Sequence, residues 1–340
     1  MWNEEVLPHT CPPRKTLAGK VINQIMTDDS TGSPQDERDR LIRRKANLER
    51  RALIYEYTRA FFRDQGFLEV ETPVRMSEVA PEQYIVPFNS EGWFLSTSPE
   101  LYMKRLLAAG YDKLFQFSRC FRRGERGQFH NPEFTLLEWY SAGADYLQML
   151  NDTERLVTHL ASQMGMDTKI KYLNQDINLA VPWRRTTVRD AFNSAAGWDP
   201  VTETDPLRFD SDLVNKVVPT FSGRPTMLLE YPSAMASLAR LKPGATEVAE
   251  RGEIFIAGLE IANAFSELAD PREQEERFRD EIAHIQKASG RKAEMPVKFL
   301  DALRHMPECG GIALGMDRLV MLLCDAGSID DVIAFPSDSA

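Results

Sequence analysis

The 340-residue chain has few cysteines, no long apolar run and no excess of basic charge. Its four cysteines, Cys11, Cys120, Cys309 and Cys324, are far apart and form no Cys-x-x-Cys pair. This spacing argues against a disulfide framework or a zinc site. No apolar run approaches the ~18 residues of a membrane span, and the N-terminus lacks the order of a signal peptide. We therefore expect a soluble cytoplasmic protein with no membrane partner.

The charge balance narrows the function classes further. The chain has 41 basic and 51 acidic residues and a net charge of −10. Nonspecific nucleic-acid binders usually carry a basic excess, so this class is disfavoured. Hydrophobic and charged contents of 43% and 27% are ordinary for a globular protein.

The pattern of residues divides the chain into a tail and a folded region. Residues 1–35 carry patches of Pro, Asp, Ser and Gly without a sustained period and are expected to form an N-terminal tail. Residues 36–340 are expected to form one domain. A helix is predicted up to about Gln65, ended by Gly66, and a short edge strand follows and ends at Pro73.

Later elements come in blocks instead of strict alternation of strand and helix. This order favours an α+β fold with a mainly antiparallel sheet flanked by helices. Helical spacing and caps predict helices at 99–109, 145–164, 187–196, 270–289 and from about 317, and strands are predicted at 227–231 and within 253–268.

The segment Cys120–Tyr140 reads CFRRGERGQFHNPEFTLLEWY and is the most informative part of the chain. Residues two apart in a strand share a face, so Phe134, Glu138 and Tyr140 are expected to face one pocket. An aromatic ring suits a flat heterocycle, a carboxylate suits an ammonium group, and the Arg122 guanidinium suits a phosphate. The segment therefore predicts a site for a nucleotide joined to an amine.

Three blocks in order, GFLEVETP, FRRGERGQFHNPEFTLLEWY and GIALGMDR, resemble motifs 1, 2 and 3 of the class II aminoacyl-tRNA synthetases. The segments TSPELYMKR, HNPEFTLLEWY and GLEIANAFSEL are most similar to lysyl-tRNA synthetases, and the resemblance covers about residues 38–335. It implies a class II synthetase catalytic core, a ligase that forms an aminoacyl-adenylate from ATP, and a homodimer joined through the Gly66–Pro73 motif.

The same resemblance implies roles around ATP. Arg122 corresponds to the motif 2 arginine that holds the α-phosphate and the substrate carboxylate, and Phe134 to the adenine-stacking position. His130 and Asn131 correspond to residues beside the triphosphate. Arg318 corresponds to the motif 3 arginine that clamps the γ-phosphate, and its place at a helix start also favours anions. Arg122 and Arg318 are the expected catalytic residues.

Two further features concern the metal and a departure in motif 2. Glu253 and Glu260 correspond to the family's Mg²⁺-binding carboxylates, so ATP and Mg²⁺ are the expected cofactors.

The usual Phe-Arg-x-Glu of motif 2 is replaced here, because Gly124 follows Arg123 and Glu125 stands one position late. A role for Glu125 in ATP binding is expected.

The amine pocket carries the substrate prediction. Asn263, Phe265 and Glu267 alternate on one expected strand face. Two buried carboxylates are electrostatically unfavourable until a cation enters, whereas an aspartate-activating relative would need a basic residue here. The resemblance implies a lysine-like substrate and assigns its ε-ammonium to Glu138, Tyr140 and Glu267, and its α-amino group to the vicinity of Glu100.

Two departures concern the acceptor. Lysyl-tRNA synthetases carry an anticodon-binding OB domain before motif 1, and only a short tail is seen here. Motif 3 has Ala313 where a glycine is usual, and one added methyl group shifts selectivity by about 1–3 kcal/mol. Both resemble the lysyl-tRNA synthetase-like ligases that transfer lysine or (R)-β-lysine to a lysine side chain of elongation factor P. We expect this protein acceptor, and the pattern argues against tRNA.

Two other interpretations stay open. One is a truncated lysyl-tRNA synthetase core that charges tRNA or makes dinucleotide signals, which Ser266 favours. The other is a non-catalytic regulatory paralogue that binds lysine, which the presence of Arg122, Glu253, Glu260 and Arg318 argues against.

Overall fold

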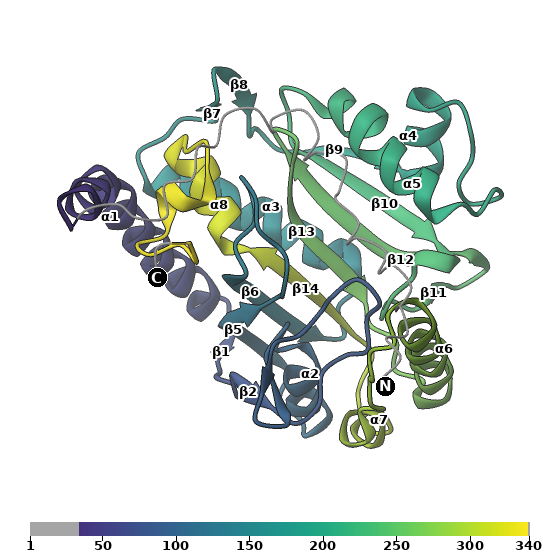
Figure 1. Cartoon of the computed structure of the whole chain (residues 1–340). Coiled ribbons are helices and arrows are strands. Elements are labelled where there is room, and N and C mark those ends of the chain that lie inside the picture. The colour runs from purple at the N-terminus through teal and green to yellow at the C-terminus, as the bar shows by residue number, and fades with distance from the viewer. Residues whose placement is uncertain (1–33, 339–340) are drawn as a thin grey trace, which may run out of the picture.

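The computed structural model describes residues 34–338, so the expected tail lies outside the described residues except for its last two positions. Within this part of the chain, a nine-stranded sheet has the order β1-β5-β6-β14-β13-β12-β10-β9, with β11 beside β12 (Figure 1). Only the pairs β1–β5 and β9–β10 are parallel. The strands are β1 (Leu68–Glu69), β5 (Lys113–Phe121), β6 (Glu133–Ala142), β9 (Arg184–Thr187), β10 (Thr226–Pro232), β11 (Leu241–Lys242), β12 (Ala245–Ile256), β13 (Leu259–Ser266) and β14 (Cys309–Gly315).

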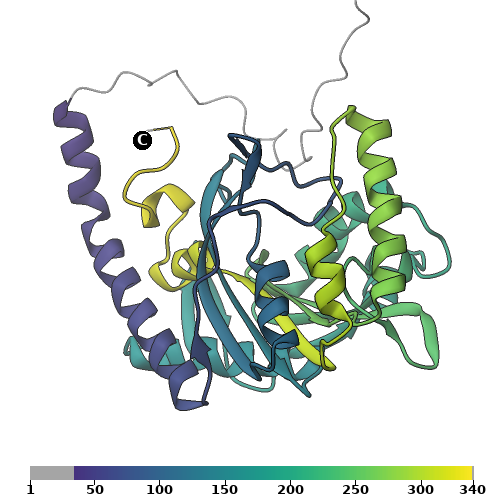
Figure 2. The same ribbon diagram turned by 90° about the horizontal axis from the view of Figure 1, so that it is seen from below.

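One face of the sheet packs against three helices, α1 (Pro34–Asp64), α3 (Tyr146–Gln163) and α8 (Met316–Cys324) (Figures 1 and 2). The side chains that alternate toward this face are apolar and buried, as Leu137 and Trp139 of β6 illustrate. Because neighbouring residues of a strand point to opposite faces, the polar residues between them face the other side. We call that other side the site face.

Two helical groups border the site face at opposite ends. The helices α2 (Glu100–Ala108), α6 (Pro271–Ser289) and α7 (Val297–Leu303) pack around Tyr140 at one end. The helices α4 (Val188–Ala195) and α5 (Pro206–Asp212) pack over β10 and β12 at the other. A π-helix at Leu213–Val217 and 3₁₀-helices at Val218–Phe221, Ser233–Met235 and Ile329–Val332 complete the helical structure.

Two small sheets lie beside the main one. β2 (Arg75–Met76), β4 (Trp93–Leu95) and β3 (Asn89–Ser90) form one, and β7 (Lys169–Tyr172) pairs with β8 (Gln175–Asn178) in the other. The first carries a long loop, residues 77–88, between β2 and β3. Val86 O of this loop accepts a hydrogen bond from Arg123 N at 2.8 Å.

The predicted α+β fold with a mainly antiparallel sheet is confirmed. Local signals explain the element ends: the Thr187 side chain accepts from Asp190 N at the start of α4, and Asp270 caps α6 in the same way. The strand predicted before Pro73 forms at Leu68–Glu69, at the sheet edge as expected, and Val70 N also donates to Phe115 O of β5 at 2.9 Å. Among residues 34–338, no helix is both long and apolar enough to cross a bilayer.

Candidate active site

The register of the sheet brings four separate parts of the sequence into one row. Glu138 of β6 pairs with Ala313 of β14, Ala313 pairs with Asn263 of β13, and Asn263 pairs with Glu253 of β12. Directly paired residues lie on the same face of a sheet. Across the site face, the row therefore carries one predicted ammonium ligand (Glu138), the unusual alanine, a further predicted substrate-binding residue (Asn263) and a predicted metal ligand (Glu253).

A second row, two residues along, contains Tyr140, Gly311, Phe265 and Arg251. A Cβ atom on Gly311 would lie 2.1 Å from Glu267 Oε1 and 2.3 Å from Tyr140 Cε1. The side chains of Tyr140 and Glu267 thus cross directly above the Gly311 backbone, and only glycine fits beneath them. This glycine of motif 3 is needed for close approach to two predicted amine ligands.

Glu138 is the most deeply buried carboxylate of this pocket, with 1% of its surface exposed. Its two oxygens accept hydrogen bonds from the hydroxyl groups of Ser98, at 2.8 Å, and Tyr140, at 2.9 Å. Burial, and then the nearby carboxylate of Glu100, raises the pKa of Glu138 to about 8. An ammonium group placed beside this carboxylate would stabilise its ionised form.

Lys104 of α2 supplies a cation that the sequence interpretation did not anticipate. Its ammonium lies 2.6 Å from Glu100 Oε1 and 2.5 Å from Glu267 Oε2, with none of its side chain exposed. Burial alone would lower the pKa of Lys104, but the two carboxylates outweigh it and raise the pKa. The expectation that the buried carboxylates lack a cation until substrate enters is therefore wrong for Glu267.

The charges of the amine pocket leave a deficit of positive charge. Three carboxyl groups, those of Glu100, Glu138 and Glu267, face one cation, Lys104, which is bonded to Glu100 and Glu267. Burial raises the pKa of Glu267, as it does that of Glu138. An ammonium group that enters this pocket would favour the ionised forms of these carboxyl groups.

Arg122 directly follows β5, next to the start of β6 and beside two other predicted ATP ligands. Its guanidinium carbon is 5.1 Å from the centroid of the Phe134 ring, and its Nη1 is 4.0 Å from Glu125 Oε1. Gly124 has a φ of +86°, a left-handed conformation that glycine adopts readily. The turn at Gly124 brings Glu125 back toward Arg122 in spite of its shifted position, while its role in ATP binding stays a prediction.

Arg318, at the start of α8, is held by groups from two other segments. It donates to the carbonyl oxygens of Glu260, at 2.8 Å, and Phe129, at 3.3 Å, and its Nη2 lies 2.6 Å from His130 Nε2. Burial and the Arg318 charge lower the pKa of His130 to about 4, so the ring is neutral and Nε2 accepts. The preceding Asp317 fixes this helix end, because it accepts from Thr135 N.

Asn131 differs from the other predicted ATP ligands. It is 3% exposed, its amide nitrogen donates to Glu133 O at 2.6 Å, and its amide oxygen accepts from Ser337 N at 3.1 Å. Both polar atoms are thus used in joining the motif 2 loop to the C-terminal segment. The structure brings His130 to Arg318 but directs Asn131 to backbone groups, and its predicted contact with ATP stays a prediction.

The two predicted metal ligands meet through an irregularity of the sheet. The β12–β13 register shifts by one residue between Ile254 and Phe255, so that Phe255 pairs with Glu260. This bulge turns Glu260 toward the site face, where Glu253 already lies. Burial raises the pKa of Glu253, with the Glu260 charge as the next cause. The described residues contain no group of three or more His, Cys, Asp or Glu side chains suited to a metal.

Two neighbouring carboxylates nevertheless fit Mg²⁺. This ion is commonly bound by one or two carboxylates together with substrate phosphates and water. Glu253 already has one partner, since its Oε1 accepts from Arg251 Nη2 at 2.7 Å. The Glu260 carboxylate lies 3.7 Å from Arg318 Nη1 and is 45% exposed. The donor set is hard oxygen, as Mg²⁺ prefers.

Comparison with known proteins agrees with this arrangement. Residues 40–339 match the model of the family described as tRNA synthetases class II (D, K and N). The chain belongs to this family. It is 39% identical over 322 residues to the lysine--tRNA ligase of Pelotomaculum thermopropionicum, and 37% identical over 312 residues to that of Carboxydothermus hydrogenoformans.

These alignments cover 86% and 84% of this chain, but 63% and 64% of the two class II relatives. A third lysine--tRNA ligase, from Thermosynechococcus vestitus, is 37% identical over 316 residues and is covered over 62% of its length. The chain therefore spans a little over three fifths of the relatives that it matches.

Within this class II core, sequence reasoning missed three polar residues of the site: Lys104, Ser98 and Arg251. Lys104 and Ser98 lie in the TSPELYMKR block, and Lys104 stands four residues after Glu100, a spacing at which helical side chains meet. That spacing was the available signal. Arg251 alternates with Glu253 on β12 and follows from the strand period alone.

Proposed function

We propose that this chain activates lysine or (R)-β-lysine with ATP, in a Mg²⁺-dependent reaction that yields an aminoacyl-adenylate and pyrophosphate. The observation that carries the proposal is the amine pocket, where the buried carboxyl groups of Glu138 and Glu267 and the carboxylate of Glu100 face a single cation, Lys104. An amino acid with a side-chain ammonium suits these groups, whereas an acidic or apolar amino acid does not.

In the proposed reaction, the amino-acid carboxylate attacks the α-phosphorus of ATP and displaces pyrophosphate. Arg122 orients the attacking carboxylate and stabilises negative charge at the α-phosphate. Arg318 stabilises negative charge at the γ-phosphate. Neutral His130 accepts a hydrogen bond from Arg318 and keeps its guanidinium in place. Bound by Glu253 and Glu260, Mg²⁺ would neutralise phosphate charge.

The acceptor of the activated amino acid is the finer part of the proposal. The relatives named above are lysine--tRNA ligases, and this favours tRNA. Ala313 supports the other acceptor, a lysine side chain of elongation factor P, because its methyl group lies in the row between Glu138 and Asn263. A methyl group there disfavours α-lysine and suits an isomer with a moved amino group.

Two accompanying predictions concern the setting of the enzyme. We propose a cytoplasmic homodimer joined through Gly66–Pro73. Leu68 of this segment is 50% exposed. On α1, the side chain of Ile42 is also exposed, at 56%. Exposed apolar side chains on adjacent elements support an interface with a second copy.

Activation is tested by ATP–pyrophosphate exchange with α-lysine, (R)-β-lysine, arginine and aspartate. Exchange with a lysine isomer, and its loss in Glu138→Gln, is the expected result. If purified protein that binds lysine supports no exchange, the adenylation proposal is wrong and the regulatory paralogue is favoured.

The acceptor is tested separately, by offering tRNA and elongation factor P together to enzyme charged with labelled amino acid. Label on elongation factor P supports the protein acceptor. Label on tRNA alone assigns the chain to tRNA charging.

A further inference from the structure

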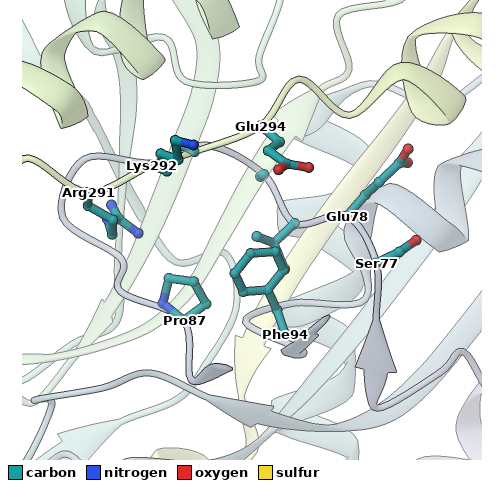
Figure 3. A pocket seen from close by; sticks show the side chains of 10 residues that line it. Ser77, Glu78, Pro87, Phe94, Arg291, Lys292 and Glu294 are labelled. Atoms are coloured by element: carbon teal, nitrogen blue, oxygen red, sulfur yellow. The ribbon is translucent and has the colours of Figure 1, made fainter. Parts of the chain in front are cut away.

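The small cavity beside the 77–88 loop does not offer a second ligand site. Figure 3 shows it between this loop, which carries Glu78 and Pro87, and the segment after α6, which carries Arg291 and Glu294. Its volume is about 20 Å³, which is room for roughly one water molecule. A charged side chain of α1, in contrast, contacts both motif 2 and motif 3 from the helix side of the sheet.

Arg51 of α1 forms an ion pair with Asp317, the residue before Arg318. Its Nη1 lies 2.6 Å from Asp317 Oδ1, and the two side chains are 15% and 3% exposed. Among the described residues, Arg51 is the only cation within ion-pair distance of this carboxylate. A buried carboxylate that loses its only cation is left with a large desolvation cost, so Asp317 depends on Arg51.

Asp317 joins the start of α8 to the motif 2 strand. β14 ends at Gly315, which pairs with Leu136 of β6. Just beyond this point, Asp317 Oδ2 accepts from Thr135 N at 2.7 Å. A side chain therefore takes over from the strand backbone at the residue that follows Phe134, the predicted adenine contact.

Arg51 also contacts the motif 2 strand itself. Its Nη2 donates to Thr135 Oγ1, at 3.4 Å, and to the Tyr55 hydroxyl, at 2.6 Å. Its Nη1 donates to Val332 O at 3.3 Å. Thr135 alternates with Phe134, so its side chain lies on the helix side of the sheet. Arg51 thus binds the back of the strand whose other face carries Phe134.

Two further donors on the same side of α1 bind the C-terminal segment, residues 331–334. Asn47 Nδ2 donates to Asp331 O and Arg44 Nη1 to Ala334 O, both at 3.1 Å. Residues 44, 47 and 51 are three and four apart, the spacing at which helical side chains share a face. Figure 2 shows the C-terminal part of the chain, in yellow, beside α1, in purple. Among these three described side chains, Arg51 alone contacts Asp317 and Thr135 by an ion pair or hydrogen bond.

We propose that Arg51 is a positioning residue for ATP, because it holds the Asp317 carboxylate where this group fixes the Phe134 end of β6 relative to Arg318. This role rests on the proposed function and gives α1, on the helix side of the sheet, a part in ATP binding. Phe134 and Arg318 are the residues expected at the adenine and at the γ-phosphate. A shift between them would therefore alter the fit of both ends of one ATP molecule.

The test compares Arg51→Met, Arg51→Lys, Asp317→Asn and the double variant Arg51→Met/Asp317→Asn. In ATP–pyrophosphate exchange with α-lysine and (R)-β-lysine, Arg51→Met and Asp317→Asn are each expected to raise the KM for ATP about tenfold. The KM for lysine should change less than about twofold, because the amine end is built on other residues. Arg51→Lys should be intermediate, since an ammonium can pair with Asp317 but cannot also serve the other three acceptors as a planar fork.

The double variant separates positioning from a loss of stability. Removing both charges takes away the unpaired buried carboxylate, so the melting temperature should rise above that of Arg51→Met. If Arg51 positions the ATP ligands through Asp317, the KM for ATP should stay raised and be no worse than in the poorer single variant. A KM for ATP that returns to the wild-type value as the melting temperature recovers would overturn the proposal. So would effects that multiply, or equal increases of the KM for ATP and for lysine.

Arg44→Met is the matched control. Arg44 lies on the same face of α1 and donates to the same C-terminal segment. Its KM values should stay at the wild-type level. An equal rise of the KM for ATP in this variant would assign the effect to the C-terminal segment and overturn the role of Asp317. If Arg51→Met does not fold, Arg51→Lys and Asp317→Asn carry the comparison of the two KM values.

Calorimetric titration with ATP and Mg²⁺, without amino acid, distinguishes the two proposals. Wild-type protein that binds ATP but supports no exchange refutes adenylation, and weaker ATP binding in Arg51→Met then still supports the positioning role. Equal affinity for ATP in wild-type protein and Arg51→Met refutes the positioning role alone. Wild-type protein that binds no ATP refutes both.

Discussion

The two ends of the site are built differently. At the amine end, the carboxylates of Glu138 and Glu267 and the ammonium of Lys104 are almost fully buried and bonded to one another or to hydroxyl groups. At the phosphate end, the side chains of Arg122, Arg318 and Glu260 are 24%, 21% and 45% exposed. Their partners there are mostly backbone carbonyl oxygens and long ion pairs.

This difference indicates where each end obtains its selectivity. The amine end is formed before substrate arrives, and its charges are too buried to be rearranged cheaply. At the phosphate end, the charged side chains are partly solvated, so they can change conformation to bind an incoming anion. In the proposed function, a lysine-like substrate would therefore be recognised by a fixed pocket, and ATP by groups that remain partly hydrated.

The largest expected effect is at the amine end. Lys104→Met removes the only cation bonded to Glu100 and Glu267 among the described residues. Leaving buried carboxylates unpaired is expected to lower the free energy of unfolding by about 3–5 kcal/mol. Urea denaturation measures this, and Lys104→Met/Glu267→Gln should recover part of the loss. An unchanged stability would mean that this end is not held together by its charges.

Arg318→Gln probes the phosphate end. Loss of this cation is expected to lower kcat in the exchange assay about 100-fold, because phosphoryl charge is no longer neutralised. The melting temperature should hardly change, since a cation at a helix start is not favoured by the helix dipole. Destabilisation as large as that of Lys104→Met would erase the contrast between the two ends.

Ala313→Gly tests selectivity at the row between Glu138 and Asn263. Removing one methyl group should shift the ratio of kcat/KM for α-lysine and (R)-β-lysine toward α-lysine by about tenfold. Parallel assays with both isomers measure the ratio, and the KM for ATP serves as the internal control. Equal changes for the two isomers would show that the methyl group does not distinguish them.

The smallest expected effect is a pH dependence of substrate binding. Because the ammonium binds ionised Glu138, whose pKa is about 8, KM for lysine should fall roughly five- to tenfold between about pH 7 and about pH 8.5. The stability of the protein without substrate changes with pH in the opposite direction to substrate binding. A raised carboxyl pKa in the folded state favours folding at low pH, and this contribution is lost as pH rises through about 8. Glu138→Gln should reduce the KM trend, and what remains is assigned to Glu267, whose pKa is also raised by burial; an undiminished trend in this variant contradicts the assignment.

Much of the site follows from short-range pattern. The two-residue period of β6 correctly placed Glu138 and Tyr140 on one face, and the cap at Asp270 correctly marked the start of α6. Lys104 was not predicted, because a Glu-x-x-x-Lys pair on a helix usually lies in solvent. Its burial depends on Glu267 and on Phe299 of α7, which are far along the chain.

The alternation of the central strands also constrains how this protein can change. In β6 and β14, apolar residues toward the helices alternate with functional residues toward the site, and β13 follows the same pattern from Ala262 to Phe265, after its bulge. Deleting a single residue within β6 would exchange the two sets, so that Glu138 would enter the apolar core and Trp139 would enter the pocket. A substitution in these strands can change the site by a small amount, whereas an insertion or deletion of one residue disrupts the site and the core together.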